Sequence, residues 1–243
     1  MVTNWVEYWN RQGAMSGELW EAQSDFFVRQ VMKELTFGPN DILLDIGCGN
    51  GHVTAALAAQ VREAHGADTS ERSVKTASER YAAIPNLYFH PLDPLDYLAV
   101  DELPLKGVTR IICVSVTQYY TNLDELASLI ARAKKIAAPG CKMLVADLLT
   151  DYNLYKDIAG VLLGGIQSGT FFAKLREVVS GNHSLYTRIR AEHPVLTMTR
   201  GDVAHICAAE GVPLRFVSRN LTGNLFRSHA LIDLVPPARE SSS

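Results

Sequence analysis

The sequence predicts an α/β protein in which a mostly parallel sheet of seven strands is covered by helices on both faces. Short apolar runs, typical of buried parallel strands, alternate along the chain with segments of helical period. Such an alternation favours a parallel sheet between two helical layers. With 243 residues, of which 47% are hydrophobic, the chain is long enough to bury one core.

Each expected element has its own local signals. The strands are expected at residues 42–46, 63–67, 87–90, 110–114, 142–147, 214–219 and 230–234. The helices are expected at residues 53–60, 70–81, 123–138 and 202–210. Ser70 and Asn122 stand at helix starts, where a side-chain oxygen can accept a bond from a free backbone N–H. Pro139, Gly140 and Gly211 stand at helix ends.

Two regions fall outside this alternation. Residues 1–39 contain all three tryptophans and are expected to form an N-terminal helical cap. Residues 151–199 form an insert that is too long for a simple crossover, and such inserts commonly act as lids. We expect helical pieces at 152–163 and 171–179, a flexible stretch at 164–170 and a polar turn at 180–184. Residues 40–150 and 200–235 then form the core of a single domain, and residues 236–243 a disordered tail.

Composition excludes several classes of partner. The net charge is −3, and no basic run offers a surface for nucleic acid or an anionic membrane. No apolar run reaches the roughly 18 residues that span a bilayer, and the first residues do not resemble a signal peptide. We expect a soluble, cytoplasmic protein, either a monomer or a homodimer. The four cysteines are scattered through apolar segments, which is typical of buried thiols rather than of a disulfide or metal site.

A glycine turn follows the first expected strand. In ILLDIGCGNGHVTAAL (residues 42–57), Gly47, Gly49 and Gly51 stand at alternate positions between the strand and a helix. Glycines let the backbone turn sharply and approach a ligand closely, and the helix adds free N–H groups. The dinucleotide fingerprint places its third glycine where this chain has His52. Asp45 would repel a pyrophosphate but suits an ammonium or sulfonium, so an NAD-dependent oxidoreductase remains only as an alternative.

The acid followed by three alternating glycines resembles motif I of the class I S-adenosylmethionine-dependent methyltransferases. The resemblance continues through AHGADTSERSV, LYFHPLDPL and IICVSVTQYYTNLDEL to the closing RSHALIDL, and covers roughly residues 40–149 and 200–234. It implies the class I methyltransferase fold with its last strand antiparallel, and S-adenosylmethionine as cofactor. One departure is Arg110, which stands where many members have an acid, so we expect that end of the fourth strand to be held differently.

The resemblance also implies the cofactor residues. In the family an acid after the second strand binds the ribose hydroxyls, here Asp68, and an acid after the third strand meets the adenine amino group, here Asp93. Leu92 and Pro94 are the expected ring contacts. The full set implied is Asp45, Gly47, Cys48, Gly49, Gly51, Asp68, Thr69, Leu92, Asp93, Pro94 and Val114.

The reaction is an in-line displacement with a good neutral leaving group, so catalysis can come mainly from holding the acceptor in place. A base is needed only for a nucleophile that holds its proton tightly. His183 and Asp147 are the candidate catalytic residues, with His193 as a further base candidate and a structural carboxylate as the alternative for Asp147.

Acceptor contacts are expected from two places. Gln118 and Tyr119 follow the fourth strand, and Tyr8 and Trp9 lie in the N-terminal segment, where they could equally anchor a helix to the sheet. The loop after the fourth strand lacks the Asn/Asp-Pro-Pro-aromatic sequence of nucleobase methylating enzymes. We therefore expect methylation of an O or N atom of a small metabolite, natural product or sugar intermediate. A homologue that binds the cofactor without methylating remains an alternative.

Overall fold

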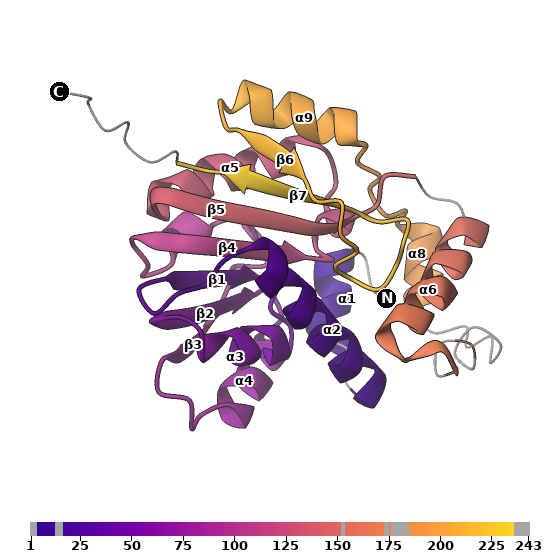
Figure 1. Ribbon diagram of the computed structural model, residues 1–243, viewed down its shortest axis with the longest axis horizontal. Coiled ribbons are helices and arrows are strands. Elements are labelled where there is room, and N and C mark those ends of the chain that lie inside the picture. Colours follow the sequence, from indigo (N-terminus) through magenta and orange to yellow (C-terminus); the bar gives the residue numbers. More distant parts are fainter. Residues whose placement is uncertain (1–3, 13–16, 152–153, 173–174, 176–184, 236–243) are drawn as a thin grey trace.

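The computed structural model describes residues 4–12, 17–151, 154–172, 175 and 185–235 (Figure 1). One seven-stranded sheet runs through it in the order β3-β2-β1-β4-β5-β7-β6. Only β7 is antiparallel to its neighbours, which confirms the predicted fold class. The strands are β1 (Ile42–Ile46), β2 (Glu63–Asp68), β3 (Leu87–Pro91), β4 (Val108–Val114), β5 (Ala137–Leu148), β6 (Leu214–Phe216) and β7 (Ser228–Asp233).

Helices cover both faces of the sheet. Those that lie largely within the predicted ranges are α3 (His52–Ala58), α4 (Glu71–Arg80), α5 (Asp124–Ile136) and α9 (Arg200–Ala209). The others are α1 (Trp5–Gln12), α2 (Glu18–Glu34), α6 (Leu154–Ser168) and α8 (Leu185–Glu192), and two short 3-10 turns are η1 (Val100–Glu102) and η2 (Thr117–Tyr119). The Ser70 side chain caps α4 by accepting from the Ser73 N–H, as predicted.

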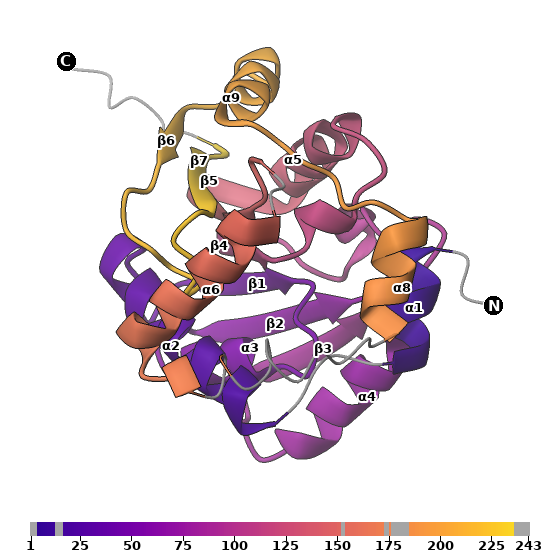
Figure 2. The ribbon, with the colours of Figure 1, turned by 90° about the vertical axis from the view of Figure 1, so that its right-hand side faces the viewer.

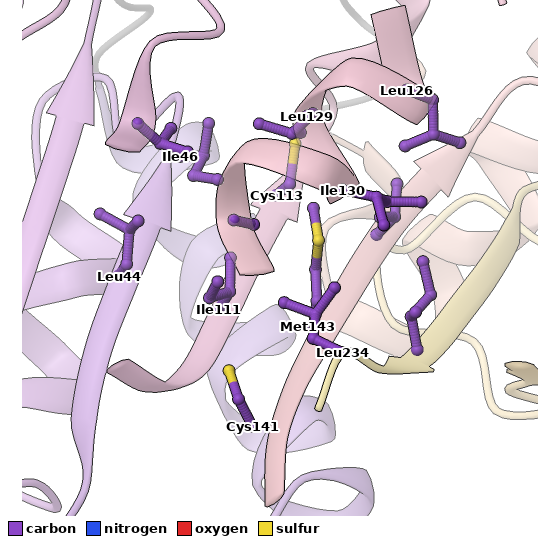
Figure 3. Packing of buried hydrophobic residues seen from close by; sticks show 14 of the residues in the cluster. Leu44, Ile46, Ile111, Cys113, Leu126, Leu129, Ile130, Cys141, Met143 and Leu234 are labelled. Atoms are coloured by element: carbon purple, nitrogen blue, oxygen red, sulfur yellow. The ribbon is translucent and has the colours of Figure 1, made fainter. Parts of the chain in front are cut away.

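The core consists of two apolar layers because successive residues of a buried strand point to opposite faces. On one face Leu44, Ile111 and Met143 pack with helices α5 and α9 (Figure 3). On the other face Leu43 and Ile112 pack with helices α2 and α3. All five of these side chains are fully buried. The central strands are therefore held rigidly, and their carboxyl ends present a fixed platform.

The helices of the insert and the first N-terminal helix gather at one edge of the sheet. Helices α6, α8 and α1 lie at the carboxyl ends of the parallel strands, the side that Figure 2 turns toward the viewer. In that view α6 lies on one side and α8 with α1 on the other. In open α/β sheets this is the edge where ligands bind, next to the point where strand order reverses. Here the order reverses between β1 and β4.

Several predicted boundaries were wrong. The stretch at 164–170 is not a flexible linker, because α6 runs on to Ser168. A Cβ on Gly164 would lie 1.6 Å from the Gly223 carbonyl oxygen, so tertiary packing against the β6–β7 loop holds these glycines in the helix. Helix α8 was not predicted, β6 is shorter than expected, and Pro139 and Gly140 lie within β5. The predicted turn at 180–184 and most of the piece at 171–179 lie outside the described residues.

The start of β4 is held by contacts of Arg110 and Thr109 with residues that precede β1. Arg110 Nη1 lies 3.3 Å from Asp41 Oδ1, and Arg110 Nε donates to the Thr36 carbonyl at 2.7 Å. Thr109 Oγ1 donates to the same Asp41 oxygen at 2.7 Å. The acid at this end of the sheet thus comes from Asp41, just before β1.

Candidate cofactor and acceptor site

The glycine turn after β1 brings main chain, rather than side chains, to the ligand-binding edge. Gly47, Gly49 and Gly51 have φ angles of 74°, 54° and 75°, a region that disfavours residues with a Cβ. A Cβ on Gly47 would lie 2.2 Å from Val116, and one on Gly51 would lie 2.5 Å from Phe89. These neighbours on β3 and after β4, which sequence reasoning missed, close around the turn and fix its shape.

Asp68 ties the end of β2 to the glycine turn. Its carboxylate accepts the Gly49 N–H at 2.8 Å and the Ser70 N–H at 2.8 Å. Burial raises the pKa of Asp68, whereas the hydrogen bonds from backbone N–H groups, including that of Thr69, lower it. Asp68 therefore faces the glycine turn, and each of its carboxylate oxygens has a lone pair left for a ligand hydroxyl.

Asp45 is buried beneath the turn at 3% exposure. Thr54 Oγ1, in the first turn of α3, donates to Asp45 Oδ2 at 2.6 Å. Burial raises the pKa of Asp45 to about 7, the Thr54 hydrogen bond lowers it, and the nearby Asp68 charge raises it. Thr54 was not predicted. The pattern that could have identified it is a hydroxyl side chain within one helical turn of the glycines, from which it can reach the carboxylate at the end of the strand.

The three predicted adenine contacts in the loop after β3 differ in exposure. Leu92 is buried and its N–H donates to the Asp68 carbonyl at 2.9 Å, which joins this loop to β2. Asp93 and Pro94 are exposed, and Asp93 Oδ1 accepts the Leu95 N–H at 2.8 Å. The carboxylate of Asp93 is therefore fixed by its own loop while it remains accessible.

The segment after β4 forms the floor next to the glycine turn. Val114 ends the strand and is half-buried. Gln118 is buried, and its Nε2 donates to the Ser115 carbonyl at 3.2 Å. The backbone carbonyl of Gln118 accepts the Leu196 N–H at 2.8 Å, so the end of the insert lies against η2. The Gln118 side chain thus stabilises the loop in this structure.

An aromatic cluster brings together three predicted acceptor residues. The Tyr119 ring lies 5.4 Å from that of Trp9 and 4.8 Å from that of Trp5, and the Tyr8 ring lies 4.9 Å from that of Trp9. Ile189 of α8 packs into the same cluster. Helix α1 is therefore anchored both to η2 and to the insert through side chains that line the end of β4. Trp5 was not predicted to take part.

Asp147 lies at a bulge in β5. Val145 pairs with Ala230 and Leu148 with Ser228, so two residues of β5 stand opposite His229. The Asp147 N–H, displaced from the ladder, lies 3.1 Å from His229 Nδ1. Burial lowers the pKa of His229 to about 4, so this ring is neutral at physiological pH. A bulge of this kind re-aims a side chain.

Two hydroxyl donors and one ion pair hold the Asp147 carboxylate. Ser115 Oγ donates to Oδ2 at 2.7 Å, and Thr222 Oγ1 donates to Oδ1 at 3.0 Å. Arg227 Nε lies 3.6 Å from Oδ1, and both side chains of this ion pair are largely buried. The partners Ser115, Thr222 and Arg227 were missed, because they come from the ends of β4 and the β6–β7 loop and share no sequence pattern.

Of the two histidines considered as bases, His183 lies outside the described residues. His193 is half-buried directly after α8, and its N–H donates to the Ile189 carbonyl at 2.7 Å.

A family model supports what this geometry indicates. The model of a methyltransferase domain matches residues 44–143, from β1 to β5, and so includes the glycine turn, Asp68 and the loop after β4. These residues therefore form a methyltransferase domain. This match replaces the oxidoreductase alternative and indicates S-adenosylmethionine as the cofactor.

Relatives of this methyltransferase differ in their reactions. It is 28% identical over 154 residues to an O-methyltransferase of Penicillium expansum, covering 60% of this chain and 51% of the relative. It is 27% identical over 116 residues to the carboxy-S-adenosyl-L-methionine synthase of Pseudomonas aeruginosa, covering 46% and 47%. The methyltransferase thus spans about half the length of these curated relatives.

A solved structure supports the fold. Magnesium protoporphyrin IX methyltransferase from Synechocystis, with bound S-adenosylhomocysteine, is 17% identical and has a TM-score of 0.53. The match covers 95% of this methyltransferase and 86% of that chain. Among the residues described for this methyltransferase, no helix is long and apolar enough to cross a membrane.

The residues of this methyltransferase fit S-adenosylmethionine. A Cβ at Gly47 would meet the Val116 side chain and one at Gly51 the Phe89 ring, so only glycines allow the tight turn that brings this backbone to the ligand-binding edge. The two acids close to the turn, Asp45 and Asp68, suit hydroxyl and ammonium groups and would repel a pyrophosphate.

Proposed function

We propose that this methyltransferase transfers the methyl group of S-adenosylmethionine to an O or N nucleophile of a small molecule. The proposal rests on one observation: the glycine turn with Asp68, and the Ser115–Asp147 pair, lie at the same edge of the sheet. The glycine turn follows β1 and Asp68 ends β2, while Ser115 follows β4 and Asp147 lies near the end of β5. A cofactor held by the first pair would present its reacting end toward the second.

The proposed cofactor contacts come from four places on this edge. Asp68 would accept from the ribose hydroxyls, and Asp93 from the adenine amino group, with Leu92 and Pro94 against the adenine ring. Asp45 would favour the ammonium group of the cofactor through its charge. The further proposed contacts are the backbone of the turn at Gly47, Cys48, Gly49 and Gly51, together with Thr69 and Val114.

When bound, the cofactor supplies an electrophilic methyl group on a sulfonium with a neutral leaving group. The protein then has to hold the acceptor in line and exclude water. Tyr119 with Tyr8 and Trp9 would form one wall of this space, and Gln118 its floor. The donors around Asp147 favour a role in orienting the acceptor over a role as base. His183 stays a predicted base.

A small-molecule acceptor is favoured by charge and by similarity. The net charge is −3, which provides no general attraction to nucleic acid. The O-methyltransferase relative supports transfer to a hydroxyl group.

The test is formation of S-adenosylhomocysteine from S-adenosylmethionine with panels of phenols, alcohols, carboxylic acids and amines. Mass spectrometry of the acceptor should show the added methyl group, and the Asp68→Ala variant should lose the product at limiting cofactor. Binding of S-adenosylmethionine without methyl transfer to any panel would argue against the proposal.

The relative named as a carboxy-S-adenosyl-L-methionine synthase favours one second candidate, a reaction that modifies the cofactor itself. The same assay separates the two functions. In that case the mass of the recovered cofactor would change and no S-adenosylhomocysteine would form.

A further inference from the structure

His229 is a buried histidine whose two ring nitrogens both face backbone N–H groups. The residue is 1% exposed. The backbone nitrogen of Asp147 lies 3.1 Å from Nδ1, and that of Leu221 lies 3.2 Å from Nε2. Thr222, next to Leu221, donates to Asp147 Oδ1. The ring therefore lies between the bulge that carries Asp147 and the β6–β7 loop that contacts its carboxylate.

The surroundings of the ring keep it neutral. Side chains two residues apart on a strand share a face, and Leu231 lies in the apolar layer that also contains Leu221. A charged group in such a layer is costly, and burial lowers the pKa of His229 to about 4. At physiological pH the ring therefore carries a single proton, on one of its two nitrogens.

A neutral imidazole can accept only one of the two N–H groups. One ring nitrogen has the lone pair that accepts, while the other holds the proton. The Asp147 N–H belongs to a strand of the sheet and is displaced from the ladder by the bulge, so it has little freedom to turn to another acceptor. The Leu221 N–H belongs to a loop, whose backbone turns more easily. This difference favours the lone pair at Nδ1, toward Asp147.

We propose that His229 is a positioning residue for methyl transfer. With its proton on Nε2, it accepts the Asp147 N–H at Nδ1 and so holds the bulge that aims the Asp147 carboxylate at the acceptor. The inference rests on the proposed function. The bond matters because Asp147 has a φ angle of 67°, a strained conformation that persists only where surrounding contacts hold it. Without the bond the carboxylate loses its fixed direction, and an acceptor held out of line reacts slowly.

The bond itself is tested by NMR on the full chain, labelled with the NMR-active nitrogen isotope. A scalar coupling across the hydrogen bond should join the Asp147 amide nitrogen to Nδ1 of His229, and Nε2 should give the signal of a protonated ring nitrogen. A proton on Nδ1, or a coupling from the Leu221 amide to Nε2, would overturn the inference. The measurement needs no substrate, so its result does not depend on methyl transfer.

Two variants separate the ring nitrogens. The side-chain oxygen of asparagine can take the place of Nδ1, and that of glutamine the place of Nε2. With the panel compound that is methylated fastest, His229→Gln should lower kcat/KM for the acceptor about tenfold or more and leave KM for S-adenosylmethionine unchanged. His229→Asn should stay close to the natural value. Equal values in the two variants, or a lower value in His229→Asn, would contradict the role of Nδ1.

The matched control is His65→Gln, a change at another buried strand histidine. His65 is 5% exposed, and its ring contacts His90 and Glu63. This variant should lower stability in urea without lowering kcat/KM for the acceptor. A loss of kcat/KM as large as in His229→Gln would assign the effect to general destabilisation and overturn the inference. If no panel compound is methylated, the proposed function fails and the role in methyl transfer with it, whereas NMR still decides which nitrogen holds the bulge.

Discussion

Ser115 Oγ donates a hydrogen bond to Asp147 Oδ2 at 2.7 Å, and both residues have left-handed backbone, with φ angles of 60° and 67°. They are the only residues other than glycine with positive φ in the described part of the chain. They end neighbouring strands, β4 and β5, at the ligand-binding edge. Such strain persists only where surrounding contacts hold it, and it concentrates at functional sites.

The strain at Ser115 predicts an unusual order of stability. Ser115→Ala loses the hydrogen bond and keeps the strain, whereas Ser115→Gly loses the bond and relieves the strain. We expect the glycine variant to be more stable than the alanine variant by about 1 kcal/mol, the reverse of the usual order in regular structure. Urea unfolding measures this difference, and an alanine variant that is the more stable would show that Ser115 is not strained.

Removal of the Asp147 carboxylate should strongly destabilise the fold. Asp147→Ala leaves the Arg227 guanidinium buried without its carboxylate, which costs about 3 kcal/mol in comparable pairs. The control is Asp151→Ala, whose ion pair with Lys156 is shorter, at 2.9 Å, but exposed. That variant should lose less than about 1 kcal/mol. Equal losses in the two variants would argue against a structural ion pair at Asp147.

The fold was largely predictable because strand and helix signals are local. The burial of residues 42–46 and the cap at Ser70 follow from short patterns, and the structure confirms them. The course of α6 through Gly164 was not predictable, since it depends on contact with Gly223 some 60 residues later. Helix α8 and the length of β6 likewise depend on tertiary contacts that no local pattern records.

The site was predictable only where it follows a motif. The glycines belong to one strand–turn–helix unit, and Asp68, at the end of the next strand, accepts the Gly49 N–H of that turn. The donors to Asp147 come from two loops more than 100 residues apart in the sequence, at Ser115 and at Thr222. Such a centre forms only when the sheet places strand ends side by side.

Asp68→Ala should weaken binding of S-adenosylhomocysteine by about 10- to 100-fold, the usual range for charged hydrogen bonds. The variant loses acceptors for ligand hydroxyls and also the bonds that hold the Gly49 N–H and the Ser70 N–H. Glu71→Ala removes the same charge at an exposed position three residues later and should change affinity little. If both variants bind like the natural sequence, Asp68 does not contact the ribose.

Affinity for S-adenosylhomocysteine should rise with pH. Burial raises the pKa of Asp45 to about 7, so at pH 6 most molecules hold a proton there. The ammonium group of the ligand favours the ionised carboxylate, so binding should strengthen about tenfold from pH 6 to pH 8 and then level off. Calorimetry with Asp45→Asn should show a flat profile over this range. A rise that persists in Asp45→Asn would assign it to another group.

The most direct test of the account is calorimetric titration of the purified protein with S-adenosylmethionine, S-adenosylhomocysteine and NAD in parallel. The geometry of the glycine turn with Asp45 and Asp68 predicts that the first two bind with micromolar affinity and that NAD does not. Binding of NAD alone would contradict the assignment of the turn and of both acids.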